Sequence, residues 1–283
     1  MKHPASRLRD DGQRSIVKLF SGLFQRHSRW SVWSDFVMMA AIAISNTVDK
    51  SNAASREKTY RTISEKYTTQ EQEAFSQAFT EVVEGMEANA DQDFLGELFM
   101  ALELGNDHNG QFFTPYGVCT MMARMTATGL LQRVERDGWI SVNDPCCGAG
   151  ALLLAFANEC TRQKVNFQTS VLFVAQDIDL VSGCMCYIQM SLMGCPGYVV
   201  IANTITNPST SYDSRGLIPK HVENVWYTPF YFKDEWHYRR LWVRLNMMIG
   251  GSTQAGNAAE PPSPPAMAET TFRETKRGQL AFF

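Results

Sequence analysis

A turn of small residues, Asp-Pro-Cys-Cys-Gly-Ala-Gly at 144–150, carries the clearest chemistry in the sequence. A mainly apolar run at 139–143 precedes it and a helical pattern at 151–157 follows it, so we expect a strand, a turn and a helix. Gly148 and Gly150 have no Cβ, so a ligand can lie against their bare backbone. The first amides of the following helix also point into the turn, which predicts a ligand site there.

The residues of this turn do not suit a phosphate. The glycine spacing is neither the G-x-G-x-x-G of a dinucleotide loop nor the G-K-[ST] ending of a phosphate loop. No Lys lies in or directly after the turn, and Asp144 opens it. A carboxylate beside free amides favours a zwitterionic amino-acid group attached to a sulfonium. If the turn is considered alone, the alternative to a cofactor site is an ordinary strand-to-helix turn that binds no ligand.

Two further segments lie where a nucleoside cofactor would need them. The apolar run 171–175 ends in Gln-Asp-Ile-Asp, and an acidic side chain at the end of the second strand holds ribose hydroxyls in doubly wound folds. Asp177 is that residue, and Ile178 is placed to cover one face of an adenine ring. A third strand is predicted at 197–202 and ends at Asn203.

A family resemblance is carried by Gly-Gln-Phe-Phe-Thr-Pro at 110–115, by the turn at 144–150 and by Gln-Asp-Ile-Asp at 176–179. These segments resemble motifs of the N6-adenine DNA methyltransferases, above all the modification subunits of type I restriction systems and their small plasmid- and phage-borne relatives. The likeness covers about residues 30–205. It implies a cytoplasmic enzyme that transfers a methyl group from S-adenosylmethionine to N6 of adenine in DNA.

The resemblance also implies a fold and roles for individual residues. The fold would be α/β, a Rossmann-like class I S-adenosylmethionine-dependent methyltransferase core. Thr114 and Pro115 would touch the methionine end of the cofactor, and Asp177 would hold its ribose. Ile178 and Asn203 would flank its adenine. The residues that would line the cofactor are Asp144, Cys146, Gly148 and Gly150.

The catalytic tetrapeptide of the family is absent from this sequence. Family members carry [DNS]-P-P-[YFW] after the fourth strand, where oxygen atoms accept the hydrogens of the adenine amine and an aromatic ring stacks on the flipped base. Thr228, Pro229 and Phe230 supply an aromatic ring, but Thr has less acceptor capacity than Asn. Asn207 and Pro208 supply the first two letters and follow the third strand closely.

Three interpretations of the catalytic site therefore stay open. The 228–230 segment forms a divergent working site, or the 207–208 pair serves instead, or the cofactor fold persists without catalysis. The last alternative is an inactive protein that binds DNA or a partner protein. In a purely structural interpretation, residues 226–231 are an aromatic-rich edge strand with Pro at its margin.

Length and composition allow one sizeable α/β core, because the chain has 283 residues and 45% hydrophobic content. The net charge of −3 argues against DNA binding by the whole surface, so local basic patches would be needed. One candidate patch lies within residues 7–29 and another within 233–244, where aromatic residues interleave. These aromatics suit either stacking on unpaired bases or a core strand.

The cysteines and apolar segments make a metal site and a membrane span unexpected. The seven cysteines contain no C-x-x-C pair, which argues against zinc and disulfides and indicates a reducing cytoplasm. The longest apolar stretch, Phe36–Ser45, is too short to span a bilayer. Its apolar residues recur at helical spacing and predict a buried helix face.

Composition shifts along the chain predict four regions. They are a basic leader at 1–30, an all-α domain at 31–105, the methyltransferase-like core at 106–250 and a disordered tail at 251–283. Within the all-α domain the helical patterns run over 31–46, 57–66, 69–88 and 92–104. This domain resembles the helical domain that precedes the core in type I modification subunits; a helical bundle without a DNA role is the alternative.

The tail ends in Gln-Leu-Ala-Phe-Phe, Gln279–Phe283, which resembles the peptides that dock replication enzymes onto the sliding clamp. A flexible tether would give such a peptide reach. A terminal strand packed against the core is the alternative. Only about 45 residues separate Asn203 from the tail, so no target-recognition domain is evident. This spacing suggests low sequence specificity or a separate specificity subunit.

Overall fold

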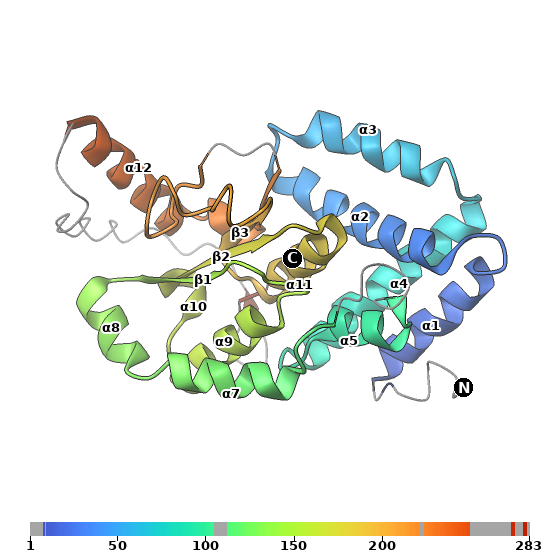
Figure 1. Cartoon of the computed structure of the whole chain (residues 1–283), viewed down its shortest axis with the longest axis horizontal. Helices are drawn as coiled ribbons and strands as arrows, with labels where there is room; N and C mark the ends of the chain where they lie inside the picture. Colours follow the sequence, from blue (N-terminus) through green and yellow to red (C-terminus); the bar gives the residue numbers. More distant parts are fainter. Residues whose placement is uncertain are drawn as a thin grey trace.

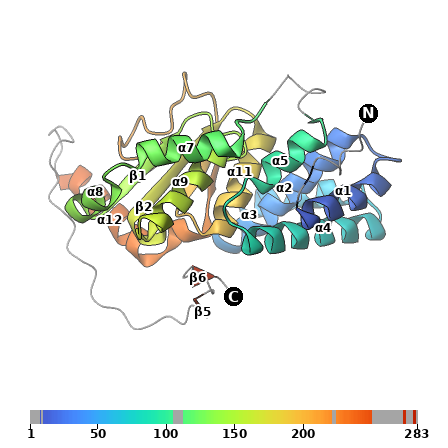
Figure 2. The same ribbon diagram turned by 90° about the horizontal axis from the view of Figure 1, so that it is seen from below.

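The computed structural model describes residues 8, 10–104, 112–220, 224–249, 273–274 and 280–281. Its elements form a helical unit and an α/β unit that lie side by side (Figures 1 and 2). The helical unit consists of α1 (Asp11–Leu23), α2 (Arg29–Val48), α3 (Ala53–Ser64), α4 (Thr69–Ala88) and α5 (Phe94–Ala101).

The helical unit begins earlier than the sequence indicated. α1 packs against α4 and buries Ile16 and Phe20 completely. The Phe20 ring contacts the rings of Phe36 and Phe75 edge-on, at centroid distances of 5.2 and 5.9 Å. The apolar side chains of α1, which lies within the predicted partly helical leader, are thus part of this core. The predicted helix at 69–88 matches α4, which Thr68 opens with a capping box.

α2 is long and apolar enough to cross a membrane by length and composition alone. However, 56% of the most apolar 18-residue stretch of this helix is buried inside the fold. Trp33, Phe36 and Val37 pack in the interior of the helical unit. α2 has the burial that is typical of a core helix.

The α/β unit contains a four-stranded sheet with the order β1-β2-β3-β4. Its strands are β1 (Ile140–Asp144), β2 (Val171–Asp177), β3 (Gly197–Ile201) and β4 (Val225–Tyr227). Its helices are α7 (Tyr116–Thr126), α8 (Leu130–Asp137), α9 (Ala151–Arg162), α10 (Phe167–Ser170), α11 (Leu180–Met193), α12 (Asp234–Ile249) and the short 3-10 helix η2 (Pro229–Phe232). β1, β2 and β3 run parallel, whereas β4 is antiparallel to β3.

The two faces of the sheet are covered in different ways. α9 and α11 pack on one face, where Phe173 and Val199 join the core that continues into the helical unit. On the other face, Val174 and Tyr198 pack with Trp236 of α12 in a second cluster. This second cluster also includes Leu217, from the long connection between β3 and β4.

This sheet matches only part of the expected Rossmann-like arrangement. In a doubly wound sheet, the chain crosses back after the third strand and adds the next strand beside the first. Here β4 is added beyond β3, so within the described residues β1 lies at an edge of the sheet. The parallel β-α-β units of the prediction are present, but the strand that would flank β1 is not found in the described part of the chain.

Little of the predicted tail can be described. β5 (Arg273–Glu274) and β6 (Leu280–Ala281) pair in antiparallel fashion. The remainder of residues 250–283, including Gln279 and the two terminal residues of the predicted clamp-binding peptide, lies outside the described residues.

Candidate cofactor and base site

The carboxyl ends of the three parallel strands bring the predicted cofactor residues to one edge of the sheet. Asp144 is the last residue of β1 and is paired with Ala175 of β2, two positions before Asp177. Ala202, next to Asn203, donates its amide to the Asp177 carbonyl at 3.0 Å. Ligands of open α/β sheets bind at this edge. Residues that lie far apart in the sequence thus meet where a cofactor would bind.

Both glycines of the 144–150 turn are required by its geometry. Gly148 and Gly150 have positive φ angles of 53° and 95°. A Cβ on Gly150 would lie 2.8 Å from the Cys186 sulfur, and one on Gly148 would lie 3.0 Å from the Phe113 ring. The Phe113 contact brings the segment that contains Thr114 and Pro115 against the turn.

The turn leads directly into the first turn of α9. Gly150 is the residue before α9, and no side chain caps this helix end. The uncapped amides of the first turn carry the positive end of the helix dipole. Cys146 in the turn is exposed, whereas Cys147 is buried and donates its amide to the Gln176 carbonyl at 3.0 Å. The exposed residues of the turn are therefore Pro145 and Cys146, whereas Gly148 is half-buried and Gly150 is buried.

Asp177 holds the turn in place from β2. One carboxylate oxygen accepts the Gly148 amide at 2.8 Å, and the other accepts the Asp179 amide at 2.9 Å. A carboxylate oxygen can accept more than one hydrogen bond, so Asp177 keeps acceptor capacity for hydroxyl groups.

Negative charge gathers around the turn. Burial raises the pKa of Asp144, and the nearby Asp177 carboxylate raises it further, while the Cys146 amide opposes the shift. Burial also raises the pKa of the Cys119 thiol to about 11, with contributions from the carboxylates of Asp93 and Asp144. In the described part of the chain, neither Asp144 nor Asp177 forms an ion pair with a basic side chain. Such a site favours a cationic ligand.

Exposed apolar side chains border the same edge. Phe112, Ile178 and Ile205 are 71%, 69% and 91% exposed. Ile178 follows β2 and Ile205 follows β3, so both lie beyond the carboxyl ends of their strands. Large apolar groups in such positions can cover the faces of a flat ring. The Asn203 side chain instead accepts the amides of Ile205 and Thr206 and shapes the loop.

The Asn207-Pro208 pair lies at this edge as well. The Thr204 hydroxyl donates to the Pro145 carbonyl at 2.5 Å, which places the loop after β3 beside the turn. The Asn207 carbonyl accepts the Gln176 side chain at 2.9 Å, and its amide donates to Asn203. The loop therefore holds Asn207 next to the last residues of β2.

Comparison with known proteins agrees with this geometry. Residues 91–253 match the family described as N-6 DNA Methylase, which is more than half of the chain. The chain belongs to this family. The matched region contains the turn, β1–β4 and the loop after β3, whereas α1–α4 precede it. No curated protein sequence matches the chain.

The methylase places Thr228 at the opposite edge of its sheet. Because β4 is antiparallel, Thr228 lies beside Gly197 at the start of β3, and not at the carboxyl edge. Its buried hydroxyl accepts the Gly197 amide at 3.0 Å and donates to the Cys195 carbonyl at 2.7 Å. Phe230, after Pro229, is buried against Gly194. The hypothesis that residues 228–230 take the target base does not agree with this placement.

The basic and aromatic residues near α12 divide into a buried group and an exposed group, the latter being Phe232, His237, Tyr238 and Arg244. Trp226, Tyr231 and Trp236 are buried. The Arg240 guanidinium lies 4.0 Å from the centre of the Tyr231 ring, and the Arg239 guanidinium lies 4.4 Å from that of Trp236. Burial lowers the pKa of Arg239 to about 10. These contacts support the core interpretation for Trp226, Tyr231 and Trp236.

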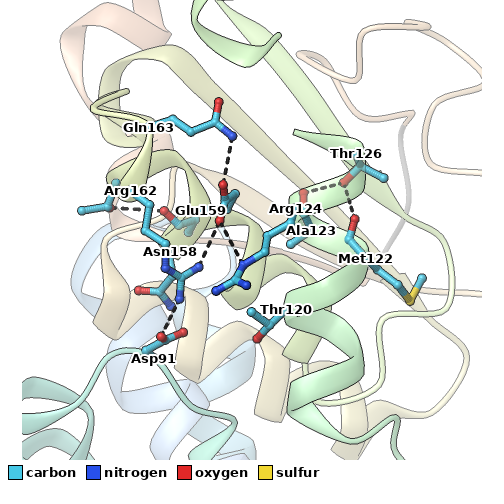
Figure 3. Close-up of polar contacts among 12 residues, drawn as sticks. Asp91, Thr120, Met122, Ala123, Arg124, Thr126, Asn158, Glu159, Arg162 and Gln163 are labelled. Carbon is cyan, nitrogen blue, oxygen red and sulfur yellow. Dashed lines mark hydrogen bonds and ion pairs between the residues drawn. The ribbon is translucent and has the colours of Figure 1, made fainter. Parts of the chain in front are cut away.

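A polar network that the sequence did not reveal ties α9 to the helical unit of the methylase (Figure 3). Arg162 lies between Glu159 and Asp91, at 3.1 and 2.5 Å. Arg124 of α7 approaches Glu159 at 3.9 Å, and Asn158 donates to the Ala90 carbonyl at 2.8 Å. Arg124, Asn158, Glu159 and Arg162 stand in ordinary helical sequence and Asp91 lies between α4 and α5, so only their packing identifies them.

The described residues contain no cluster of three His, Cys, Asp or Glu side chains that could hold a metal ion. The seven cysteines are all free thiols. The candidate site therefore consists of backbone amides, carboxylates and exposed apolar groups at one edge of the sheet.

Proposed function

We propose that this N-6 DNA methylase binds S-adenosylmethionine at the 144–150 turn and transfers its methyl group to N6 of adenine in DNA. One observation carries the proposal: a turn with two glycines and two carboxylates, for which the described residues supply no counter-cation, lies where three parallel strands end. That arrangement fits a ligand with a sulfonium, an amino-acid group and a nucleoside.

The cofactor would be held by residues that the turn brings together. Asp144 and the amides after Gly148 would face the amino-acid end, with Thr114 and Pro115 adjoining. Asp177 would accept ribose hydroxyls, and Ile178 would cover the adenine. Further contacts are assigned to Cys146, Gly150 and Asn203. When bound, S-adenosylmethionine supplies an electrophilic methyl group on a sulfonium.

The target adenine would be held by Asn207 and Pro208. The side-chain oxygen of Asn207 and a neighbouring carbonyl can accept the hydrogens of the adenine amine. These acceptors would hold the amine nitrogen toward the cofactor site, and the proton that the nitrogen loses on methylation would pass to water. Orientation supplies most of the rate enhancement in such a substitution.

A second candidate function is cofactor binding without methyl transfer. It is favoured by the missing tetrapeptide and by β4, which runs away from the cofactor edge and not toward it. In that case the protein would act on DNA or on a partner by binding alone.

One experiment separates the two functions. Binding of S-adenosylmethionine is measured by calorimetry, and methyl transfer from labelled cofactor to unmethylated DNA is measured with the same preparation. Transfer to N6 of adenine supports the enzyme, whereas binding without transfer supports the second function. The matched Asp144→Ala variant should lose cofactor binding in either case. Absence of binding by the unaltered chain would contradict both.

Partners and location also belong to this proposal. The enzyme would act in the cytoplasm on DNA, with a specificity subunit supplying the recognition sequence. Gln279–Phe283 would dock on the sliding clamp. Purified clamp should retain the full chain better than a chain without residues 279–283, and equal retention would contradict the docking proposal.

A further inference from the structure

The buried side chain of Gln189 joins the cofactor turn to the helical unit. Gln189 lies in α11 and is fully buried. Its amide nitrogen donates to the Ala149 carbonyl in the turn and to the Asp93 carboxylate before α5, both at 2.8 Å. Its oxygen accepts the Leu95 amide of α5 at 3.0 Å. One side chain thus spans the turn and the last helix of the helical unit.

On the turn side, Gln189 fixes a peptide group between the two glycines. The Ala149 carbonyl and the Gly150 amide belong to one planar peptide unit. Gln189 holds the carbonyl end, and Cys147 accepts the amide end at 2.8 Å. Gly148 and Gly150 leave the backbone conformationally free, so the orientation of this peptide depends on such outside contacts.

On the helical side, Asp93 gives the contact a rigid anchor. The oxygen that accepts from Gln189 also accepts the Gly96 amide at 3.0 Å and caps α5. A Cβ on Gly96 would lie 2.0 Å from the other carboxylate oxygen, so the carboxyl group is packed tightly. Burial raises the pKa of Asp93, and no described basic side chain pairs with it.

We propose that Gln189 is a positioning residue, through which the helical unit sets the shape of the turn and therefore the affinity for the cofactor. This inference rests on the proposed cofactor role of the turn. Gln189 does not contact the cofactor in this proposal; it acts by orienting the peptide between Ala149 and Gly150.

The first test compares two buried glutamines. Gln189→Met keeps the approximate length of the side chain and removes its hydrogen bonds. Gln13→Met is the matched control, because Gln13 is also fully buried and donates to a backbone carbonyl, that of Phe94, at 2.8 Å. We expect Gln189→Met to weaken S-adenosylmethionine binding about tenfold, as expected for a buried carbonyl that loses its donor.

Gln13→Met should lower the melting temperature without changing the affinity of the folded protein. Calorimetric titration well below the melting temperature of each variant measures this difference. An equal loss of affinity in the two variants, or no loss in Gln189→Met, would overturn the proposal.

A second variant tests the donor itself. Gln189→Glu places a second carboxyl beside Asp93, and only a protonated carboxyl can donate to the Ala149 carbonyl. The affinity of Gln189→Glu for S-adenosylmethionine, relative to that of the unaltered protein, should therefore recover as the pH falls. The loss of affinity in Gln189→Met should instead be the same at every pH. The same constant deficit in both variants would show that the loss is structural and would contradict a positioning role.

A third measurement does not depend on the cofactor. Without any ligand, amides of residues 144–151 should exchange with solvent faster in Gln189→Met than in the unaltered protein or in Gln13→Met. If the unaltered chain binds no S-adenosylmethionine, the proposed function fails, and this exchange still decides whether Gln189 holds the turn. Unchanged exchange in Gln189→Met would overturn the inference.

Discussion

At the residue scale, Asp144 and Asp177 give the cofactor site its charge. Asp177 is occupied by the amides of Gly148 and Asp179, while Asp144 accepts only the Cys146 amide at 3.2 Å. Burial and the neighbouring carboxylate raise the pKa of Asp144. Asp144 therefore loses its negative charge at a higher pH than an ordinary aspartate does. Its attraction for a cation is lost over the same pH range.

We therefore predict that affinity for S-adenosylmethionine falls as the pH is lowered through the raised pKa of Asp144, while the amino group of the cofactor stays protonated. The sign follows because protonation removes the negative charge of Asp144. Asp144→Asn should bind more weakly at pH 7 and lose most of this pH dependence. Calorimetric titrations at several pH values check this, and an equal slope in the variant would contradict the role of Asp144.

A second residue-scale prediction separates the two candidate base sites. Asn207→Ala should reduce methyl transfer about 100-fold, as for loss of one well-placed polar group, with cofactor affinity unchanged. Thr228→Ala should instead lower the free energy of unfolding by about 1–3 kcal/mol, because it leaves the Gly197 amide without its acceptor. The rate of methyl transfer per folded molecule checks the first prediction, and urea unfolding checks the second. A specific loss of transfer in Thr228→Ala would restore residues 228–230 as the site.

At the element scale, the strand–turn–helix of β1, the 144–150 turn and α9 depends on backbone that only glycine adopts easily. Gly150 combines a φ of 95° with close contact to Cys186. Gly148 combines a φ of 53° with contact to Phe113. Neither position therefore has room for a side chain.

Gly150→Ala should lower the free energy of unfolding by about 1–3 kcal/mol through backbone strain and should weaken cofactor binding. Gly117→Ala in α7 is the matched control, because a Cβ there meets no atom within 4 Å. In a helix this change should be neutral or slightly stabilising. Thermal unfolding and cofactor titration of both variants check the prediction, which fails if Gly150→Ala behaves like Gly117→Ala.

At the scale of the whole molecule, the helical and α/β units share one hydrophobic core that extends from α1 to β4. Arg56 of α3 strengthens this join. Its guanidinium pairs with Asp49 at 2.7 Å, donates to the Val225 carbonyl at 2.8 Å and lies 4.1 Å from the centre of the Trp226 ring. The outer side of β4 is thereby attached to the helical unit.

We predict a single cooperative unfolding transition for the two units. Arg56→Ala should lower the free energy of unfolding by about 3–5 kcal/mol, because it leaves the buried Asp49 without its cation. Arg61→Ala in the same helix removes an exposed ion pair with Glu57, so it should change the free energy of unfolding by less than about 1 kcal/mol. Calorimetry checks both, and two separate transitions would contradict the shared core.

The sequence by itself determined the local part of this protein. The glycine turn, the strands on either side of α9 and the acidic residue at the end of β2 follow from composition and periodicity over short windows. α4 could be placed to the residue because its capping box and apolar spacing are local signals. These features depend on interactions between residues that are close in the chain.

Only the tertiary structure decided which edge of the sheet each segment reaches. Thr228 has a plausible sequence context, but the antiparallel direction of β4 carries it to the edge opposite the turn. Gln189 looks like one more residue of an apolar helix, yet it contacts Ala149 and Asp93, which lie 40 and 96 positions away. Strand direction and buried polar contacts depend on long-range packing, which no short window of sequence contains.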